Sequence, residues 1–117
     1  MKHLSRDQII HLAGGETLTA RAQSAPGRYA WVGVVSLEKS KVLYLNSAEE
    51  GELGRLRVIY FEVEQRVIWM DYDVHQEQML NTAVVELPGC GELSGLLGRY
   101  GVEVSDLAFK RETGYPI

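Results

Sequence analysis

Acidic residues and one histidine occupy every second position of the segment Asp71–Glu77. Asp71, Asp73, His75 and Glu77 are spaced two residues apart, so an extended strand would project all four from one face. Carboxylates and an imidazole together suit a divalent ion such as Mn²⁺ or Zn²⁺. Successive ligands would lie about 7 Å apart, so a metal would need help from another element. We favour the alternative, in which these residues leave the sheet and face water, and we expect no metal and no cofactor.

Cys90 is the only cysteine of the chain, and it lies in a glycine-rich turn before a predicted helix. The positive end of a helix dipole makes a thiolate more available. With His75 as base and Asp71 or Asp73 to orient it, a Cys–His–Asp nucleophile is one hypothesis. However, a lone cysteine is usually a small buried hydrophobe, and no catalytic motif surrounds this one. We therefore predict that the protein is not an enzyme, and keep Cys90 and His75 as weak catalytic candidates.

Aromatic residues are concentrated in the middle of the chain, with acidic residues among them. A small sheet needs several of them for its core, but a two-layer fold leaves one sheet face bare. Exposed aromatic side chains with acidic neighbours are typical of a surface that binds a partner. The expected partner-binding residues are Trp31, Tyr60, Glu62, Trp69, Asp71 and Asp73. A homodimer, through the sheet face or an edge strand, would use the same features.

The overall charge argues against nucleic acid as the partner. Lys and Arg total 12 against 16 Asp and Glu, which gives a net charge of −4. Binding to phosphates needs clustered basic residues, and only Arg55, Arg57 and Arg66 would form such a face, if their strands are neighbours. No leader pattern and no apolar run near about 20 residues is present. We therefore expect a cytoplasmic protein that does not enter membranes.

The elements that must position these residues begin with a short helix. Ser5 and Gln8 have the spacing of a capping box, and Gly14-Gly15 ends the apolar pattern that follows. Alternating or continuous apolar residues then predict strands. These strands cover residues 17–22, 29–37, 41–46, 55–64, 66–72, 80–87 and 104–110. The pattern of 80–87 also fits a helix, but Val84-Val85 and the following Pro88-Gly89 favour a strand.

A second helix is predicted over residues 92–100 from its apolar spacing. Gly95 and Gly98 each disfavour it by about 1 kcal/mol relative to alanine. This cost is easiest to understand if the helix backbone packs closely against another element.

Together these elements predict one α+β domain over residues 1–117. Strands joined by tight turns are antiparallel, so we expect a twisted antiparallel sheet of about six to seven strands with the two short helices packed on one face. The function that this favours is a small acidic protein-binding module, acting as an inhibitor, an antagonist or an immunity-type protein. Two alternatives stay open. One is a small-ligand binder or enzyme that uses Cys90 or Asp71–Glu77, and the other is a nucleic-acid binder.

Overall fold

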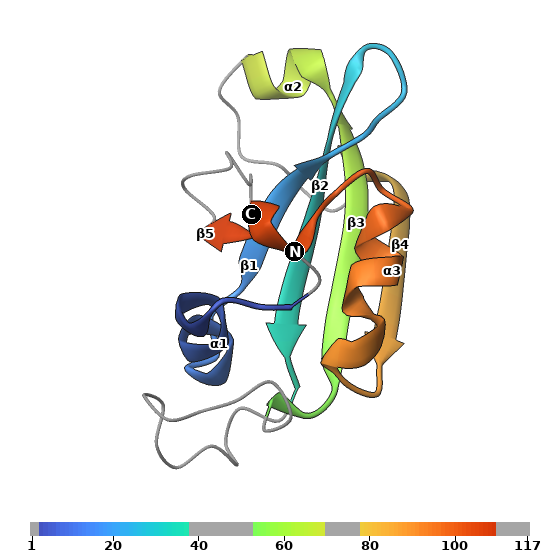
Figure 1. Cartoon of the computed structure of the whole chain (residues 1–117). Helices are drawn as coiled ribbons and strands as arrows, with labels where there is room; N and C mark the ends of the chain where they lie inside the picture. Colours follow the sequence, from blue (N-terminus) through green and yellow to red (C-terminus); the bar gives the residue numbers. More distant parts are fainter. Residues whose placement is uncertain (1–2, 38–52, 70–77, 110–117) are drawn as a thin grey trace.

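The chain folds around an open antiparallel sheet with the strand order β4-β3-β2-β1-β5 (Figure 1). The computed structural model describes residues 3–37, 53–69 and 78–109. The strands are β1 Leu18–Ala22, β2 Arg28–Ser36, β3 Leu56–Glu64, β4 Leu80–Leu87 and the two-residue β5 Ala108–Phe109. The α+β class is confirmed. The six to seven strands of the prediction are too many, because the described residues form four full strands and the short β5.

Two of the predicted strands differ from the structure, and a third cannot be compared. A strand over residues 66–72 is predicted to pair back on β3, but β3 runs directly into the helix α2, Gln65–Trp69. The prediction is therefore wrong for residues 66–69, and residues 70–72 lie outside the described residues. Val67 and Ile68 of α2 pack against buried side chains of the sheet, and this packing favours a helical turn over a strand. The segment 104–110 starts as the 3₁₀ turn η6, Val104–Asp106, before β5. The expected strand 41–46 lies outside the described residues.

The N-terminal helix α1, Arg6–Ala13, begins and ends as its sequence indicates. The backbone N–H of Gln8 donates to the hydroxyl of Ser5 at 3.2 Å, and the N–H of Ser5 donates to Oε1 of Gln8 at 2.9 Å. This is a complete capping box. At the other end Gly15 has φ +89°, a left-handed conformation that glycine adopts without steric cost.

Gln8 also joins α1 to a distant part of the chain. Its side-chain amide donates to the carbonyls of Val104 and Leu107, at 2.8 and 3.0 Å. The side chain is nearly buried, so these bonds satisfy donors that water does not reach. The start of the sequence is therefore held against the η6–β5 segment.

The main core lies between the sheet and two helices on the same side of it, α1 and α3 (Leu93–Gly98, preceded by the 3₁₀ turn η5, Cys90–Glu92). Leu12 of α1 and Leu97 of α3 are fully buried there against Val32 and Val58 of the central strands. The prediction that these two helices pack on one face of the sheet is confirmed. Among the described residues, no helix is long and apolar enough to cross a membrane.

A second cluster lies on part of the opposite face of the sheet. Trp31 and Phe61 face each other across β2 and β3 with ring centroids 5.8 Å apart, and both are at most 1% exposed. Val67 and Ile68 of α2 pack against this cluster. The guanidinium of Arg21 lies 4.4 Å from the Tyr29 ring centroid and 5.1 Å from that of Trp31. The expectation that Trp31 belongs to a bare aromatic face is therefore wrong.

Candidate functional site

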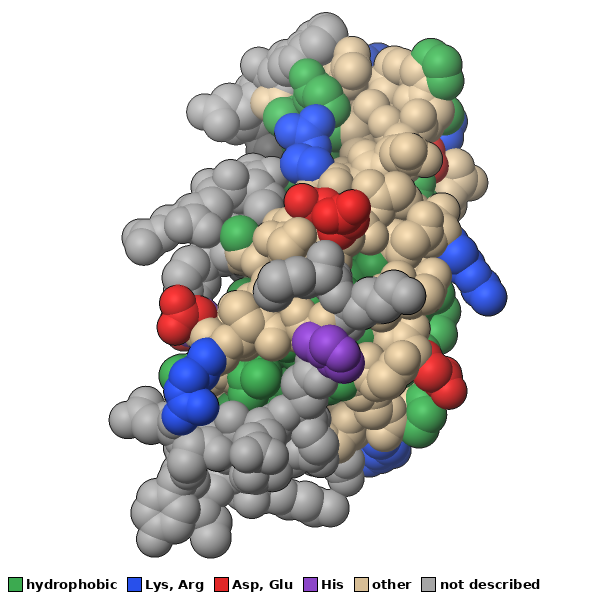
Figure 2. Space-filling view, in the orientation of Figure 1, with side chains coloured by type: hydrophobic (Ala, Val, Ile, Leu, Met, Phe, Trp, Pro, Cys, Tyr) green, Lys and Arg blue, Asp and Glu red, His purple; other side chains and the backbone are tan. Residues whose placement is uncertain are grey.

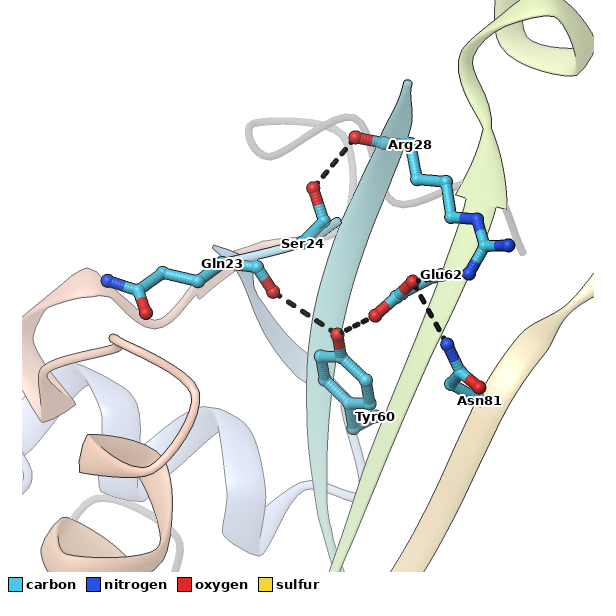
Figure 3. A network of polar contacts seen from close by, with 6 residues as sticks. All are labelled: Gln23, Ser24, Arg28, Tyr60, Glu62 and Asn81. Atoms are coloured by element: carbon cyan, nitrogen blue, oxygen red, sulfur yellow. Dashed lines mark hydrogen bonds and ion pairs between the residues drawn. The ribbon is translucent and has the colours of Figure 1, made fainter. Parts of the chain in front are cut away.

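A buried carboxylate, Glu62, lies at the centre of a polar network that joins three strands (Figure 3). Its Oε2 accepts a hydrogen bond of 2.5 Å from the hydroxyl of Tyr60. Its Oε1 accepts from Nη1 of Arg28 at 3.1 Å and from Nδ2 of Asn81 at 3.3 Å. Glu62 is 6% exposed, so these three donors compensate a charge that water scarcely reaches.

The two acidic groups of the network have pKa values displaced in opposite directions. The hydrogen bond from Tyr60, which outweighs burial, holds the pKa of Glu62 below its usual value, with further help from Arg28 and Asn81. Burial, together with the hydrogen bond to Glu62, raises the pKa of the Tyr60 hydroxyl. The phenol therefore stays protonated as a donor while the carboxylate stays ionised. The network therefore stabilises the ionised carboxylate of Glu62 inside the fold.

Tyr60 is further fixed by its ring and by a second acceptor. Its ring stacks on Tyr100 with centroids 4.4 Å apart and planes 9° apart, and its hydroxyl lies 3.2 Å from the carbonyl oxygen of Gln23. Sequence analysis placed Tyr60 and Glu62 on a partner surface. The structure buries both of them, Tyr60 within the main core and Glu62 within its polar network, so neither is available to a partner in the folded chain.

Asn81 reaches Glu62 because β4 carries a bulge at this point. The pairing of β3 with β4 shifts between Tyr60↔Ala83 and Glu62↔Leu80, and Asn81 has φ +52°. Asparagine tolerates this left-handed region better than most residues, and bulges re-aim side chains at the ends of pairing. Sequence analysis did not identify Arg28 or Asn81. An asparagine inside an otherwise apolar strand was the available signal.

Beyond the bulge, β4 and α3 form an exposed edge of the molecule. β4 is at one end of the strand order, and from Ala83 to Leu87 it pairs regularly with β3. Val84 is 57% exposed and is the one exposed large hydrophobic side chain among the described residues. We call the exposed residues Val84, Glu86, Glu92, Gly95 and Arg99 the β4–α3 edge. Along this side of the molecule, hydrophobic, basic and acidic side chains all reach the surface (Figure 2).

The glycines of α3 do not pack closely against another element, contrary to the sequence-based expectation. A Cβ placed on Gly95 or on Gly98 would meet no atom within 4 Å. The cost of about 1 kcal/mol for each glycine is therefore not explained by packing within the described structure. Both glycines leave a flat outer surface on α3.

Other predicted site residues do not come together in the described part of the chain. Cys90 is half-buried at the start of η5 and packs against the main core. Its proposed partners Asp71, Asp73 and His75 lie outside the described residues, as does the side chain of Trp69 at the end of α2. Of the residues that the structure describes, no three histidines, cysteines or carboxylates form a group suited to a metal ion.

The three arginines of the nucleic-acid hypothesis are divided between two places, because Arg55 and Arg57 lie around the start of β3 and Arg66 lies in α2. Arg57 lies near the start of β3 and pairs with Glu86 at 2.9 Å, whereas Arg66 lies in α2 and pairs with Glu64 at 2.7 Å. The seven residue steps from Arg57 to Glu64, the end of β3, separate the two by roughly 23 Å. Each charge is also met by a carboxylate, which lowers the attraction for phosphate.

A hollow of about 280 Å³ lies between α1, β1 and the η6–β5 segment. Asp7, His11 and Ser105 are among its lining residues. The His11 Nδ1 is already 2.7 Å from Glu16 Oε2, and Gln8 uses its amide within the chain. The hollow therefore offers few groups for a ligand.

In comparisons with known proteins, no family model, no curated protein and no solved structure matches this chain.

Proposed function

We propose that this protein is a protein-binding module that takes up its partner along the β4–α3 edge. The observation that carries the proposal is the exposure of Val84 on an edge strand. Edge strands offer unpaired backbone groups to another chain, and proteins usually guard them with charges, prolines or bulges. Here the bulge at Asn81 and Pro88 limit the edge at its two ends. The segment between them pairs regularly and exposes Val84, although it also carries the charge of Glu86.

Strand addition is a common mode of protein recognition, in which main-chain hydrogen bonds supply affinity and exposed side chains supply specificity. Val84 would give an apolar contact on one side of the added strand, while Glu92 and Arg99, at the two ends of α3, flank it on the other. Inhibitor, antagonist and immunity-type roles are the forms of this function that we consider, since each works by occupying a partner's surface. The separation of Arg57 from Arg66 counts against the nucleic-acid alternative.

A capture experiment with matched lysine variants tests the proposal. The tagged protein is incubated with lysate of its source. The molar masses of the complexes that it forms, including those with untagged copies of itself, are then measured by light scattering. Val84→Lys places a charge on the edge and should abolish capture. Ser105→Lys, at an exposed position within η6, should leave capture intact. Equal capture by both variants, or no defined complex with the unmodified protein, would contradict the proposal.

A further inference from the structure

We infer that the partner at the β4–α3 edge is a second copy of this chain, an inference that rests on the function proposed above. In this dimer β4 pairs with β4 of the second copy in antiparallel fashion, and the two sheets continue into one. The twofold axis passes through the sheet at Val84. The α3 helices of the two copies then lie side by side on the same face of the joined sheet.

The register follows from the side chains of β4. About a twofold axis perpendicular to a sheet, the residue on the axis faces its own copy, and residues equally far from it face each other. An axis at Val84 covers this exposed side chain with Val84 of the second copy. It also places Glu86 opposite Thr82, so that no like charges meet. An axis at Val85 would instead set Val84 against the carboxylate of Glu86.

The charges at the two ends of α3, on its N-cap Glu92 and its C-cap Arg99, are self-complementary in the same arrangement. Glu92 and Arg99 are seven residues apart, which is about two helical turns or 10 Å, so they share one side of the helix. Both are exposed, and neither forms an ion pair with another described residue. In an antiparallel pair of α3 helices, Glu92 of each copy faces Arg99 of the other. An unrelated partner would have to supply both charges at this spacing, whereas a second copy supplies them by symmetry.

Gly95 lies next to the midpoint between Glu92 and Arg99, three residues from the first and four from the second. In the dimer this midpoint is the place where the two α3 helices come closest, and a residue without a side chain permits that approach. The open space around Gly95 is then filled by the second copy. The same pairing removes the exposed edge of β4, which is otherwise a hazard for aggregation.

Disulfide trapping tests the register. In a Cys90→Ser background, Val84→Cys brings two thiols together across the axis, with Cα atoms about 4.5–5.5 Å apart, a separation that a disulfide spans. Glu86→Cys is the matched control, because the two copies of residue 86 would be separated by about 13 Å along the strands. We expect a covalent dimer with Val84→Cys and none with Glu86→Cys. A monomer with Val84→Cys, or equal trapping by both variants, would overturn the inference.

Charge reversal tests the α3 contact through the dissociation constant, measured by analytical ultracentrifugation. Glu92→Arg and Arg99→Glu should each weaken the dimer by about tenfold, because both symmetry-related pairs become like-charge contacts. The double variant Glu92→Arg/Arg99→Glu reverses both signs and should restore the original constant. Thermal unfolding confirms that each variant is folded. Additive weakening in the double variant would overturn the α3 contact.

The outcomes also separate this inference from the proposed function. A wild-type protein that stays monomeric up to about 1 mM, a concentration at which even weak complexes form, rules out the homodimer. If that monomer still captures another protein and loses it with Val84→Lys, the protein-binding function stands and the partner is a different chain. If the wild-type protein stays monomeric and also captures no other protein, both proposals are ruled out.

Discussion

The hydroxyl of Tyr60 donates to the carboxylate of Glu62 at 2.5 Å, although the two residues belong to the same strand. They are two residues apart and therefore project from the same face of β3. Asn81 of β4 and Arg28 of β2 complete the contacts of the carboxylate. The buried carboxylate of Glu62 thus fixes the relative positions of β2, β3 and β4. It also fixes the end of β4 that carries Asn81, where the β4–α3 edge begins.

Removing the Tyr60 hydroxyl should destabilise the fold. In Tyr60→Phe the buried Glu62 loses its shortest hydrogen bond, and we expect the free energy of unfolding to fall by about 1–3 kcal/mol. Tyr100→Phe is the control, because it keeps the stacked ring and its hydroxyl makes no hydrogen bond with another described residue. Urea denaturation of both variants gives the comparison. Equal losses in the two would show that the hydroxyl of Tyr60 is not special.

The depressed pKa of Glu62 predicts a specific dependence of stability on pH. Because its pKa is lower in the folded chain than the usual 4.5, the folded state favours the ionised form. Its contribution is therefore fully present above about pH 4.5 and is lost as the pH falls through the folded-state pKa. Glu62→Gln removes this contribution, so its stability should change less between pH 7 and pH 3 than that of the wild type. Parallel stability curves for the two proteins would contradict this assignment.

The glycines of α3 allow stability and association to be measured separately. Gly95→Ala and Gly98→Ala should each stabilise the isolated chain by about 1 kcal/mol, since the added methyl group meets no atom. Chemical denaturation at concentrations where the monomer dominates measures this gain. If α3 packs against α3 of a second copy at Gly95, Gly95→Ala should also weaken self-association, and Gly98→Ala much less. A loss of stability in either monomer would show that the glycine has a packing role.

Gly101, just after α3, should respond in the opposite way to the helix glycines. It has φ +72°, and a Cβ there would overlap the side chain of Gln23. Gly101→Ala should therefore destabilise the fold by about 1–2 kcal/mol for the left-handed backbone alone, with the overlap in addition. Adding Gln23→Ala should recover the part due to overlap, as measured by a double-mutant cycle. No recovery would assign the whole effect to the backbone.

Much of the fold is visible in local sequence patterns. The Ser5–Gln8 capping box, the terminating glycines and the two-sided apolar run of β2 each describe a structure that forms within a few residues. The choice of a strand for residues 80–87 is also confirmed, because Pro88 and the β-branched pair Val84-Val85 disfavour a helix. Each of these features depends on interactions between residues that are close together in the sequence.

The remaining features depend on contacts between distant parts of the chain. The segment of α2 has an alternating pattern that fits a strand, and only its packing against the Phe61 cluster decides for a helix. The burial of Trp31 depends on the same contact. For the candidate site, sequence analysis named Glu62 but not Arg28 or Asn81. The three residues that donate hydrogen bonds to Glu62 lie up to 53 positions apart in the sequence, from Arg28 to Asn81. No local pattern connects them.

The bonds from Gln8 to Val104 and Leu107 set an order of events during synthesis. The residues that they join are 96 and 99 positions apart. At translation rates of about 5–20 residues per second, α1 is synthesised roughly 5–20 s before its acceptors. β1 likewise cannot pair with β5 until residues 108 and 109 have been synthesised. The apolar face of α1 therefore lacks part of its packing until residues 104–107 have been synthesised.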